Sequence, residues 1–196
     1  MNTQAIISFL VYAIINAFTP GPGNILAFNT MSNYGWKNGK KTLLGIFAGY
    51  YCVQGLCAVF TFGLNQLLNS LIFVLKYVGA VYIAVLAIHI FRSKPEEGSK
   101  EEGVSSFVGF ALQFVNVKIY LFGITALTGY VLPYYTSFGM LIFFCMLIAT
   151  IGSIATTSWA VFGAIFQRVY IRYFKAINII LALILLECAF GMLFKI

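Results

Sequence analysis

Six mainly apolar runs, each roughly 20 residues or longer, follow one another along the chain and constrain its fold more than any other feature. A helix of that length spans the hydrocarbon of a bilayer. The runs are too long and too rich in glycine for transmembrane strands, which alternate over about ten residues. The predicted spans are Ala5–Ser32, Leu43–Leu68, Leu71–Phe91, Phe107–Leu132, Phe138–Phe166 and Phe174–Phe194. The sequence therefore predicts an all-α, polytopic membrane protein.

The amino-acid composition supports a lipid environment. Apolar residues make up 61% of the chain and charged residues 9%, whereas a soluble domain of this length exposes much of its surface to water. The first run is not a cleavable signal, because it is long and no basic segment precedes it. The lipid bilayer is thus the first expected partner.

The positive charge lies in alternate connections between the spans. The net charge of +7 could indicate a nucleic-acid partner, but the placement of the basic residues excludes that interpretation. The basic connections hold Lys37, Lys40, Lys41, Arg92, Lys94, Lys100, Arg168, Arg172 and Lys175. Because cytoplasmic loops carry the excess of Lys and Arg, both termini are predicted to be extracytoplasmic. Lys195 is the one small exception.

A polar segment divides the chain into two halves. Residues 92–106 contain charged residues, Pro95 and glycines, and are predicted to form a flexible cytoplasmic linker. The halves, 1–91 and 107–196, hold three spans each and run in opposite directions, as in inverted-repeat transporters. Gly45 and Gly49 form a close-packing face on the second span. This face packs within the chain or, as an alternative, in a homodimer.

The most unusual motif lies in the middle of the first span. It consists of Thr19, Pro20, Gly21, Pro22, Gly23 and Asn24. Two prolines and two glycines in four residues cannot continue an α-helix. Since the prolines have no N–H, the carbonyls of Asn16 and Phe18 lose their usual donors. Unpaired backbone groups are costly in hydrocarbon, so protein, water or substrate must satisfy them.

A break of this kind yields two half-helices with opposite partial charges at their facing ends. The first half would end in free carbonyls, and the second would begin with free N–H groups at Gly23, Asn24 and Ile25. An amino acid carries an ammonium and a carboxylate that match these two ends. The alternative interpretation is a proline kink that serves helix packing.

Polar residues within the other spans are the remaining candidates. Gln113 and Asn116 are three residues apart in the fourth span and are expected to share a helix face. Lys118 lies deep in that span. It is expected to have a role in substrate binding or coupling; the alternative is a structural tether between helices. Glu187 is expected to carry or relay a proton, or to neutralise Lys118; the alternative is that its protonated form hydrogen-bonds between helices. The small residues from Gly152 to Ser158 are interpreted as a packing stripe, with a polar lining of a substrate path as the less favoured alternative.

The motifs resemble the LysE/RhtB family of bacterial amino-acid exporters. The family's Thr-Pro-Gly-Pro-Asn signature is similar to Thr19–Gly23, with Gly23 at the position of the family's Asn and Asn24 directly after it. The family's Asn-Pro-Lys is similar to Asn116-Val117-Lys118. The run Phe110–Ile119 resembles the cysteine/O-acetylserine exporter branch. The resemblance covers the whole chain and implies export across the bacterial cytoplasmic membrane, with a proton as the candidate counter-ion.

Other classes of function fit the sequence less well. A metal-ion or other cation transporter of similar architecture is the alternative, but the spans hold one Glu and the chain has no Asp. An intramembrane enzyme is not expected. Such an enzyme would need two Asp, two His or a nucleophilic serine motif, and the sequence has none of these. The cysteines form no metal-binding pattern, and no cofactor is expected. A non-transporting assembly or sensor protein has little need of four helix breakers.

Overall fold

The computed structural model describes residues 1–63, 65–92 and 105–194. Within these ranges every regular element is a helix, which confirms the predicted all-α class. The elements are α1 (Thr3–Phe18), α2 (Pro22–Gly63), α3 (Asn65–Arg92), α4 (Ser106–Val115), α5 (Val117–Ala126), the π-helix η1 (Leu127–Val131), α6 (Phe138–Ile165) and α7 (Gln167–Phe194). The predicted linker 92–106 lies, except at its two ends, outside the described residues.

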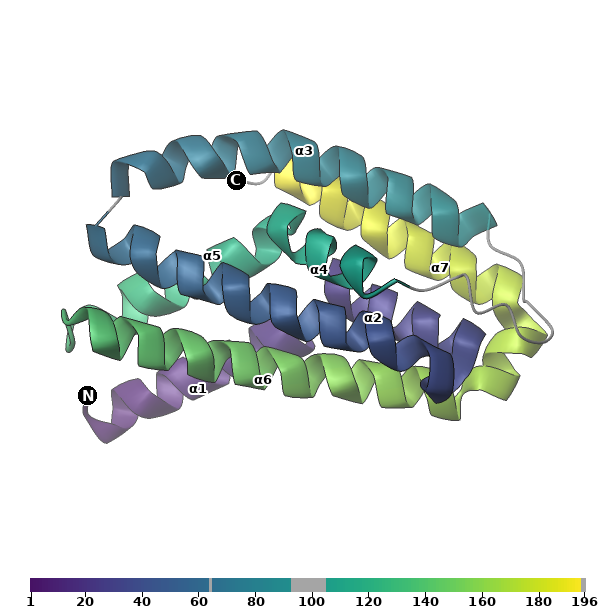
Figure 1. Cartoon of the computed structure of the whole chain (residues 1–196), viewed down its shortest axis with the longest axis horizontal. Coiled ribbons are helices and arrows are strands. Elements are labelled where there is room, and N and C mark those ends of the chain that lie inside the picture. Colours follow the sequence, from purple (N-terminus) through teal and green to yellow (C-terminus); the bar gives the residue numbers. More distant parts are fainter. Residues whose placement is uncertain (64, 93–104, 195–196) are drawn as a thin grey trace.

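Helix α2 reverses its direction at Gly35. This residue has φ 68° and ψ 178°, a conformation that residues with a β-carbon rarely adopt. A β-carbon on Gly39 would lie 2.7 Å from Met31 Sδ and 3.1 Å from Thr30 Cγ2. In a straight helix these residues would be about 12 Å apart along the axis. Residues 22–34 and 36–63 are therefore two helical segments that fold back on each other (Figure 1).

Three of the described helices are long and apolar enough to cross a membrane by length and composition. These are Pro22–Gly63, Phe138–Ile165 and Gln167–Gly191. A fourth results if the bent pair Ser106–Val115 and Val117–Val131 is one span. The chain is thus a multi-helix membrane protein, while the complete six-span arrangement remains a proposal.

The fourth predicted span, Phe107–Leu132, is not one straight helix. It bends by 58° between α4 and α5, and Asn116 at the junction has φ −86° and ψ 88°. The expectation that Gln113 and Asn116 share a helix face is therefore wrong, because Asn116 lies outside both helices. Asparagine competes with the helix for backbone hydrogen bonds, which favours it at helix ends. Here the Asn116 N–H donates to Gln113 O at 3.3 Å.

The backbones of α2 and α4 touch through glycines. A β-carbon on Gly45 would overlap the Ser106 carbonyl, and one on Gly109 would overlap that of Thr42. Gly49 has room for no β-carbon either, since it would lie 2.7 Å from Phe110 O. The Gly45–Gly49 face is therefore used for packing within the chain, which was the first of its two predicted uses.

Two apolar clusters make up the buried core. One includes Ile25, Met31 and Leu112, and joins α2 and α4 to α3 and α7. The other includes Phe9 and Ile148, and joins α1 to α2, α5 and α6. Figure 1 shows the corresponding arrangement, with α3 beside α7 and α2 beside α6. The end of α1, the start of α2 and the α4–α5 junction all lie where the two clusters meet.

Candidate functional site

The chain leaves helical geometry between α1 and α2, and side chains satisfy the backbone there. Thr19 N still donates to Ile15 O, and Thr19 Oγ1 donates to Asn16 O at 2.8 Å. Trp159 Nε1 donates to Phe18 O at 3.2 Å. The carbonyls of Asn16 and Phe18 receive no backbone hydrogen bond from Pro20 and Pro22, because proline has no N–H. Side chains donate to them instead.

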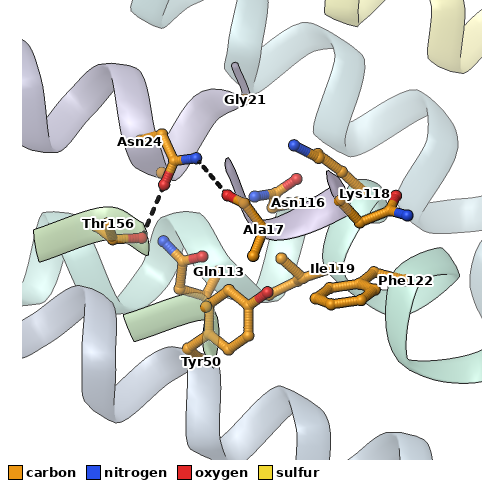
Figure 2. Close-up of a pocket in the computed structure, with 13 residues that line it drawn as sticks. Ala17, Gly21, Asn24, Tyr50, Gln113, Asn116, Lys118, Ile119, Phe122 and Thr156 are labelled. Atoms are coloured by element: carbon orange, nitrogen blue, oxygen red, sulfur yellow. Dashed lines mark hydrogen bonds between the residues drawn. The ribbon is translucent and has the colours of Figure 1, made fainter. Parts of the chain in front are cut away.

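Asn24 ties the two helices together. Its Nδ2 donates to Ala17 O at 2.9 Å and to Thr19 O at 3.1 Å. Its Oδ1 accepts a hydrogen bond from Thr156 Oγ1 at 2.8 Å, so α6 is held to the same point (Figure 2). All polar atoms of this carboxamide are therefore engaged within the protein, which makes Asn24 a positioning residue for the interruption.

Lys118 places its ammonium at the carboxyl end of α1. Its Nζ donates to Thr19 O and Thr19 Oγ1 at 2.9 Å each, and lies 3.4 Å from Pro20 O. The negative end of a helix dipole favours a cation at this position. A β-carbon on Gly21 would lie 3.0 Å from Lys118 Nζ and Cδ, so the glycine leaves room for the lysine to reach these carbonyls. Lys118 thus meets the backbone carbonyl of Thr19 and approaches that of Pro20.

These contacts correct the predicted state of the helix ends. The carboxyl end of α1 has no free carbonyl, because Thr19, Asn24, Trp159 and Lys118 occupy its acceptors. The amino end of α2 is more open. Ile25 N donates to Gly21 O, whereas the N–H groups of Gly23 and Asn24 have no acceptor among the described residues. The available binding capacity at this interruption is therefore that of hydrogen-bond donors.

A small polar cavity lies between the two helix interruptions (Figure 2). Its volume of about 20 Å³ is room for about one water molecule. Helices α1, α2, α4, α5 and α6 contribute to its wall. The lining residues are Asn16, Ala17, Gly21, Gly23, Asn24, Tyr50, Gln113, Asn116, Lys118, Ile119, Phe122, Gly152 and Thr156. The structure thus brings together most of the residues predicted from the first and fourth spans.

Two carboxamides in this cavity have oxygen atoms without a hydrogen-bond partner. Gln113 is 1% exposed and Asn116 is 2% exposed. Gln113 Nε2 donates to Gly109 O at 3.2 Å, but Gln113 Oε1 and Asn116 Oδ1 accept nothing from the described residues. A buried acceptor without a donor costs about 1–3 kcal/mol. The cavity therefore offers two acceptors, from Gln113 and Asn116, beside the donors at the start of α2.

One larger cavity adjoins this site, and another lies between α2, α3 and α4. One of about 320 Å³ lies between α1, α5 and α7 and shares Asn16, Asn116, Lys118 and Phe122 with the small cavity. The other, of about 340 Å³, is lined by residues of α2, α3 and α4, including Asn29, Thr42 and His89. Pro22 lines the first of these and not the small cavity.

Some predicted residues lie apart from the cavities. The side chains of Thr19 and Pro20 are exposed and line none of the three cavities, and only their backbone and the Thr19 hydroxyl take part in the site. Glu187 is exposed on α7, next to Cys188, which lines the 320 Å³ cavity with Lys118. The role predicted for Glu187 thus stays a prediction.

Three residues of the site were not among the favoured candidates from the sequence. Gly152 and Thr156 belong to the predicted packing stripe, yet both line the cavity, as in the less favoured interpretation, and Thr156 bonds to Asn24. Tyr50 reaches the cavity because Gly152 has no β-carbon, which would lie 2.5 Å from the tyrosine ring. The four-residue spacing from Gly152 to Thr156 shows that they share a helix face, but it does not show what that face meets.

No group of three or more His, Cys, Asp or Glu side chains lies together in the described part of the chain. That part therefore offers no carboxylate-rich or Cys/His site for a divalent cation. The cavity is instead lined by neutral amides, hydroxyls and a single ammonium, a set of groups that suits a small zwitterion.

Comparison with known proteins decides the family. The family model described as LysE type translocator matches residues 14–195. The chain belongs to this family. A cysteine/O-acetylserine efflux protein of Klebsiella pneumoniae subsp. pneumoniae is 40% identical over 190 residues, which cover 96% of this chain and 97% of the relative. Relatives of the same name from Escherichia coli K12 and Shigella sonnei are 38% identical over the same shares. No solved structure matches the chain.

Membership of the LysE type translocator family confirms two predictions from the sequence. The resemblance read from the two motifs holds over nearly the whole chain. The protein is a membrane translocator and not an enzyme. Gly23, where the family's signature has Asn, is the departure that lies closest to the cavity.

Proposed function

We propose that this protein exports small amino acids or their derivatives, of the cysteine and O-acetylserine type, across the bacterial cytoplasmic membrane. The observation that carries the proposal is the 38–40% identity, over 96% of the chain, to relatives named cysteine/O-acetylserine efflux proteins. The polar cavity between two helix interruptions supports it, because its donors and acceptors match a zwitterion.

In the proposed complex the substrate's two charged groups bind different sides of the cavity. Its carboxylate accepts from the N–H groups of Gly23 and Asn24, at the positive end of α2. Its ammonium donates to Gln113 Oε1 and Asn116 Oδ1, the two acceptors without a protein partner. Lys118 keeps the carboxyl end of α1 satisfied, so the substrate's ammonium does not need those carbonyls.

The helices support an arrangement of six spans. The first is α1 followed by α2 as far as Gly35, and the second is the rest of α2. Helix α3, the bent set from α4 to η1, α6 and α7 supply the other four. The first span of each half, 1–91 and 107–196, is then interrupted near its middle. Matching interruptions are what an inverted repeat produces.

The orientation follows from the basic residues. The turn of α2 at Gly35, the end of α3 and the start of α7 lie at the same end of the bundle (Figure 1). A β-carbon on Gly35 would lie 3.9 Å from Gln167 Nε2, in agreement with that placement. All three segments adjoin connections rich in Lys and Arg, so this end is proposed to be cytoplasmic and both termini extracytoplasmic.

Export requires the small cavity to open. An amino acid is several times larger than one water molecule, so the cavity of about 20 Å³ is closed to it. The 340 Å³ cavity lies toward the proposed cytoplasmic end and the 320 Å³ cavity toward the other end. Alternate enlargement of these two spaces would pass a substrate from one side to the other.

Uptake into inside-out membrane vesicles tests the proposal. Vesicles with the protein should accumulate labelled O-acetylserine and cysteine above vesicles without it, and unlabelled cysteine should compete. A panel of neutral and charged amino acids defines the range of substrates. If no member of the panel enters faster than into control vesicles, the proposed function is wrong.

Proton coupling is a separate part of the proposal. An acid vesicle interior should drive accumulation against the substrate gradient, and a protonophore should abolish it. Glu187→Gln tests the proposed proton carrier, since loss of driven accumulation with intact exchange of labelled for unlabelled substrate would support the role. Unchanged driven accumulation would show that Glu187 is not the proton carrier.

A homodimer would need a face other than Gly45–Gly49, because that face packs against α4. The mass of the protein in detergent tests whether it is a dimer.

A further inference from the structure

The glycine at position 23 leaves space directly in front of the Gln113 carboxamide. A β-carbon on Gly23 would lie 3.3 Å from Gln113 Nε2 and 3.4 Å from Gln113 Oε1. Contacts this short require the neighbouring group to move slightly, and any longer side chain would enter the cavity itself. Gly23 is buried in the first turn of α2 and lines the cavity.

The Gln113 carboxamide is fixed in place on its other side. Its Nε2 donates to Gly109 O, and its β- and γ-carbons would each lie 2.9 Å from a β-carbon on Gly49. The amide thus has little freedom to turn away from position 23. Its Oε1, in a residue 1% exposed, has no donor among the described residues.

The neighbouring residue cannot substitute for a side chain at position 23. Asn24 uses its Nδ2 on Ala17 O and Thr19 O, and its Oδ1 on Thr156. An asparagine at position 23, as in the family's signature, would carry its amide about one bond beyond the β-carbon, within reach of Gln113 Oε1. It would then both supply the missing donor and occupy the cavity.

We propose that Gly23 is a specificity-determining residue of the site. Its missing side chain leaves Gln113 Oε1 free to accept the substrate's ammonium, and leaves the space of a side chain to the substrate. The chain would therefore accept amino acids extended beyond the β-carbon, such as β-O-acyl amino acids, better than a protein with asparagine at this position. This inference rests on the proposed export function and names the residue that sets the substrate size.

Gly23→Asn tests the inference in the vesicle assay. The ratio of O-acetylserine to cysteine uptake should fall about tenfold or more, because the longer substrate needs the space that the introduced side chain fills. The matched control is Gly55→Asn, since Gly55 also lies in α2 and has nothing within 4 Å of its would-be β-carbon. This control should keep the wild-type ratio.

Thermal unfolding in detergent separates specificity from damage. Gly23→Asn should unfold at the wild-type temperature or above it, because the new amide pairs with Gln113 Oε1. A wild-type uptake ratio in Gly23→Asn, or an equal fall for both substrates, would overturn the inference. If that variant does not reach the membrane, Gly23→Ser is judged by the same ratio. Failure of the export proposal can be told apart from failure of the inference about Gly23, because in the first case the wild-type protein would transport neither substrate.

Discussion

Two buried polar clusters in this bundle differ in how completely they are hydrogen-bonded. In the Tyr170 cluster, the tyrosine hydroxyl accepts from Asn29 Nδ2 at 3.2 Å and from Asn33 Nδ2 at 3.0 Å, and donates to Asn178 Oδ1 at 2.6 Å. This hydroxyl uses all of its hydrogen-bonding capacity within the protein. The cluster joins α2 to α7, and its central hydroxyl has no capacity left for a ligand.

The cavity cluster, Gln113 and Asn116 with Asn24 and Thr156, is incomplete. Gln113 Oε1 and Asn116 Oδ1 lack donors, although both residues are almost fully buried. Gln54 Oε1, Thr61 Oγ1 and Ser153 Oγ also lack partners but line neither the small cavity nor those of about 320 and 340 Å³; Ser153 lines a separate cavity of about 650 Å³. A missing partner alone is thus not a sign of function. The proposed role of Gln113 and Asn116 rests on a second observation, which is that both residues line one cavity between interrupted helices.

The largest effect on transport is expected from Lys118, which lines the same cavity as the cavity cluster and contacts the carboxyl end of α1. Lys118→Met removes the ammonium that donates to Thr19 and approaches Pro20. Hydrogen bonds with charged groups contribute about 1.5–3 kcal/mol, so transport should fall on the order of a hundredfold. Vesicle uptake measures this. Lys118→Arg should retain part of the activity, and wild-type uptake in Lys118→Met would show that the contact is dispensable.

A somewhat smaller effect is expected from the Gln113 acceptor. Gln113→Leu keeps the side chain's size and removes Oε1, which should reduce transport about tenfold to a hundredfold. Gln54→Leu is the matched control, because Gln54 is 0% exposed, has the same unpaired Oε1, and lies outside the cavity. Competition by unlabelled cysteine gives the affinities. Equal losses in both variants would erase the distinction between the cavity cluster and other unpaired amides.

A moderate effect is expected from the residue that holds Asn24. Thr156→Val removes the donor to Asn24 Oδ1 while it preserves volume. One neutral hydrogen bond contributes about 0.5–1.5 kcal/mol, so transport should fall roughly twofold to tenfold. Thr157→Val is the control, since the Thr157 hydroxyl donates to Ser153 O within its own helix. If the control loses as much activity as Thr156→Val, the Asn24 contact has no special part.

The smallest effect on transport is expected from a change in the Tyr170 cluster. Tyr170→Phe leaves the amides of Asn29 and Asn33 without their hydroxyl partner, and hydrogen bonds between membrane helices average about 0.6 kcal/mol. The unfolding temperature should fall slightly, while the order of substrate preference should not change. Thermal unfolding and the substrate panel check both expectations. A changed preference would mean that this cluster also takes part in selection.

The sequence predicts one helix interruption better than the other. Proline has no N–H, so Pro20 and Pro22 point to the end of α1 and the start of α2. Asn116-Val117 contains no helix breaker, and the helix signal runs through it. The one available signal was the Asn-Pro-Lys of the family, where proline stands at the position of Val117.

The partners of the predicted residues were harder to anticipate than their identity. Residue type places Lys118 inside a span, but the carbonyl that it meets is 99 residues away in the chain. Likewise, the sequence does not show that Thr156 lies on the face of α6 that packs against α2. The carbonyls predicted to bind substrate are satisfied by Trp159 and Asn24, because tertiary contacts supply donors that local sequence does not show.

The close approach of Gly45 and Gly109 determines which parts of the bundle can rearrange. With carbonyl oxygens lying against bare α-carbons, no side-chain layer separates α2 from α4, and neither helix can slide or roll without a steric clash. We therefore expect residues 36–63 of α2 and helix α4, which carries Gln113, to move as one unit. We expect the motion that admits a solute at interfaces lined by larger side chains, such as that between α3 and α7, where Ile83, Leu86 and Leu185 belong to one apolar cluster.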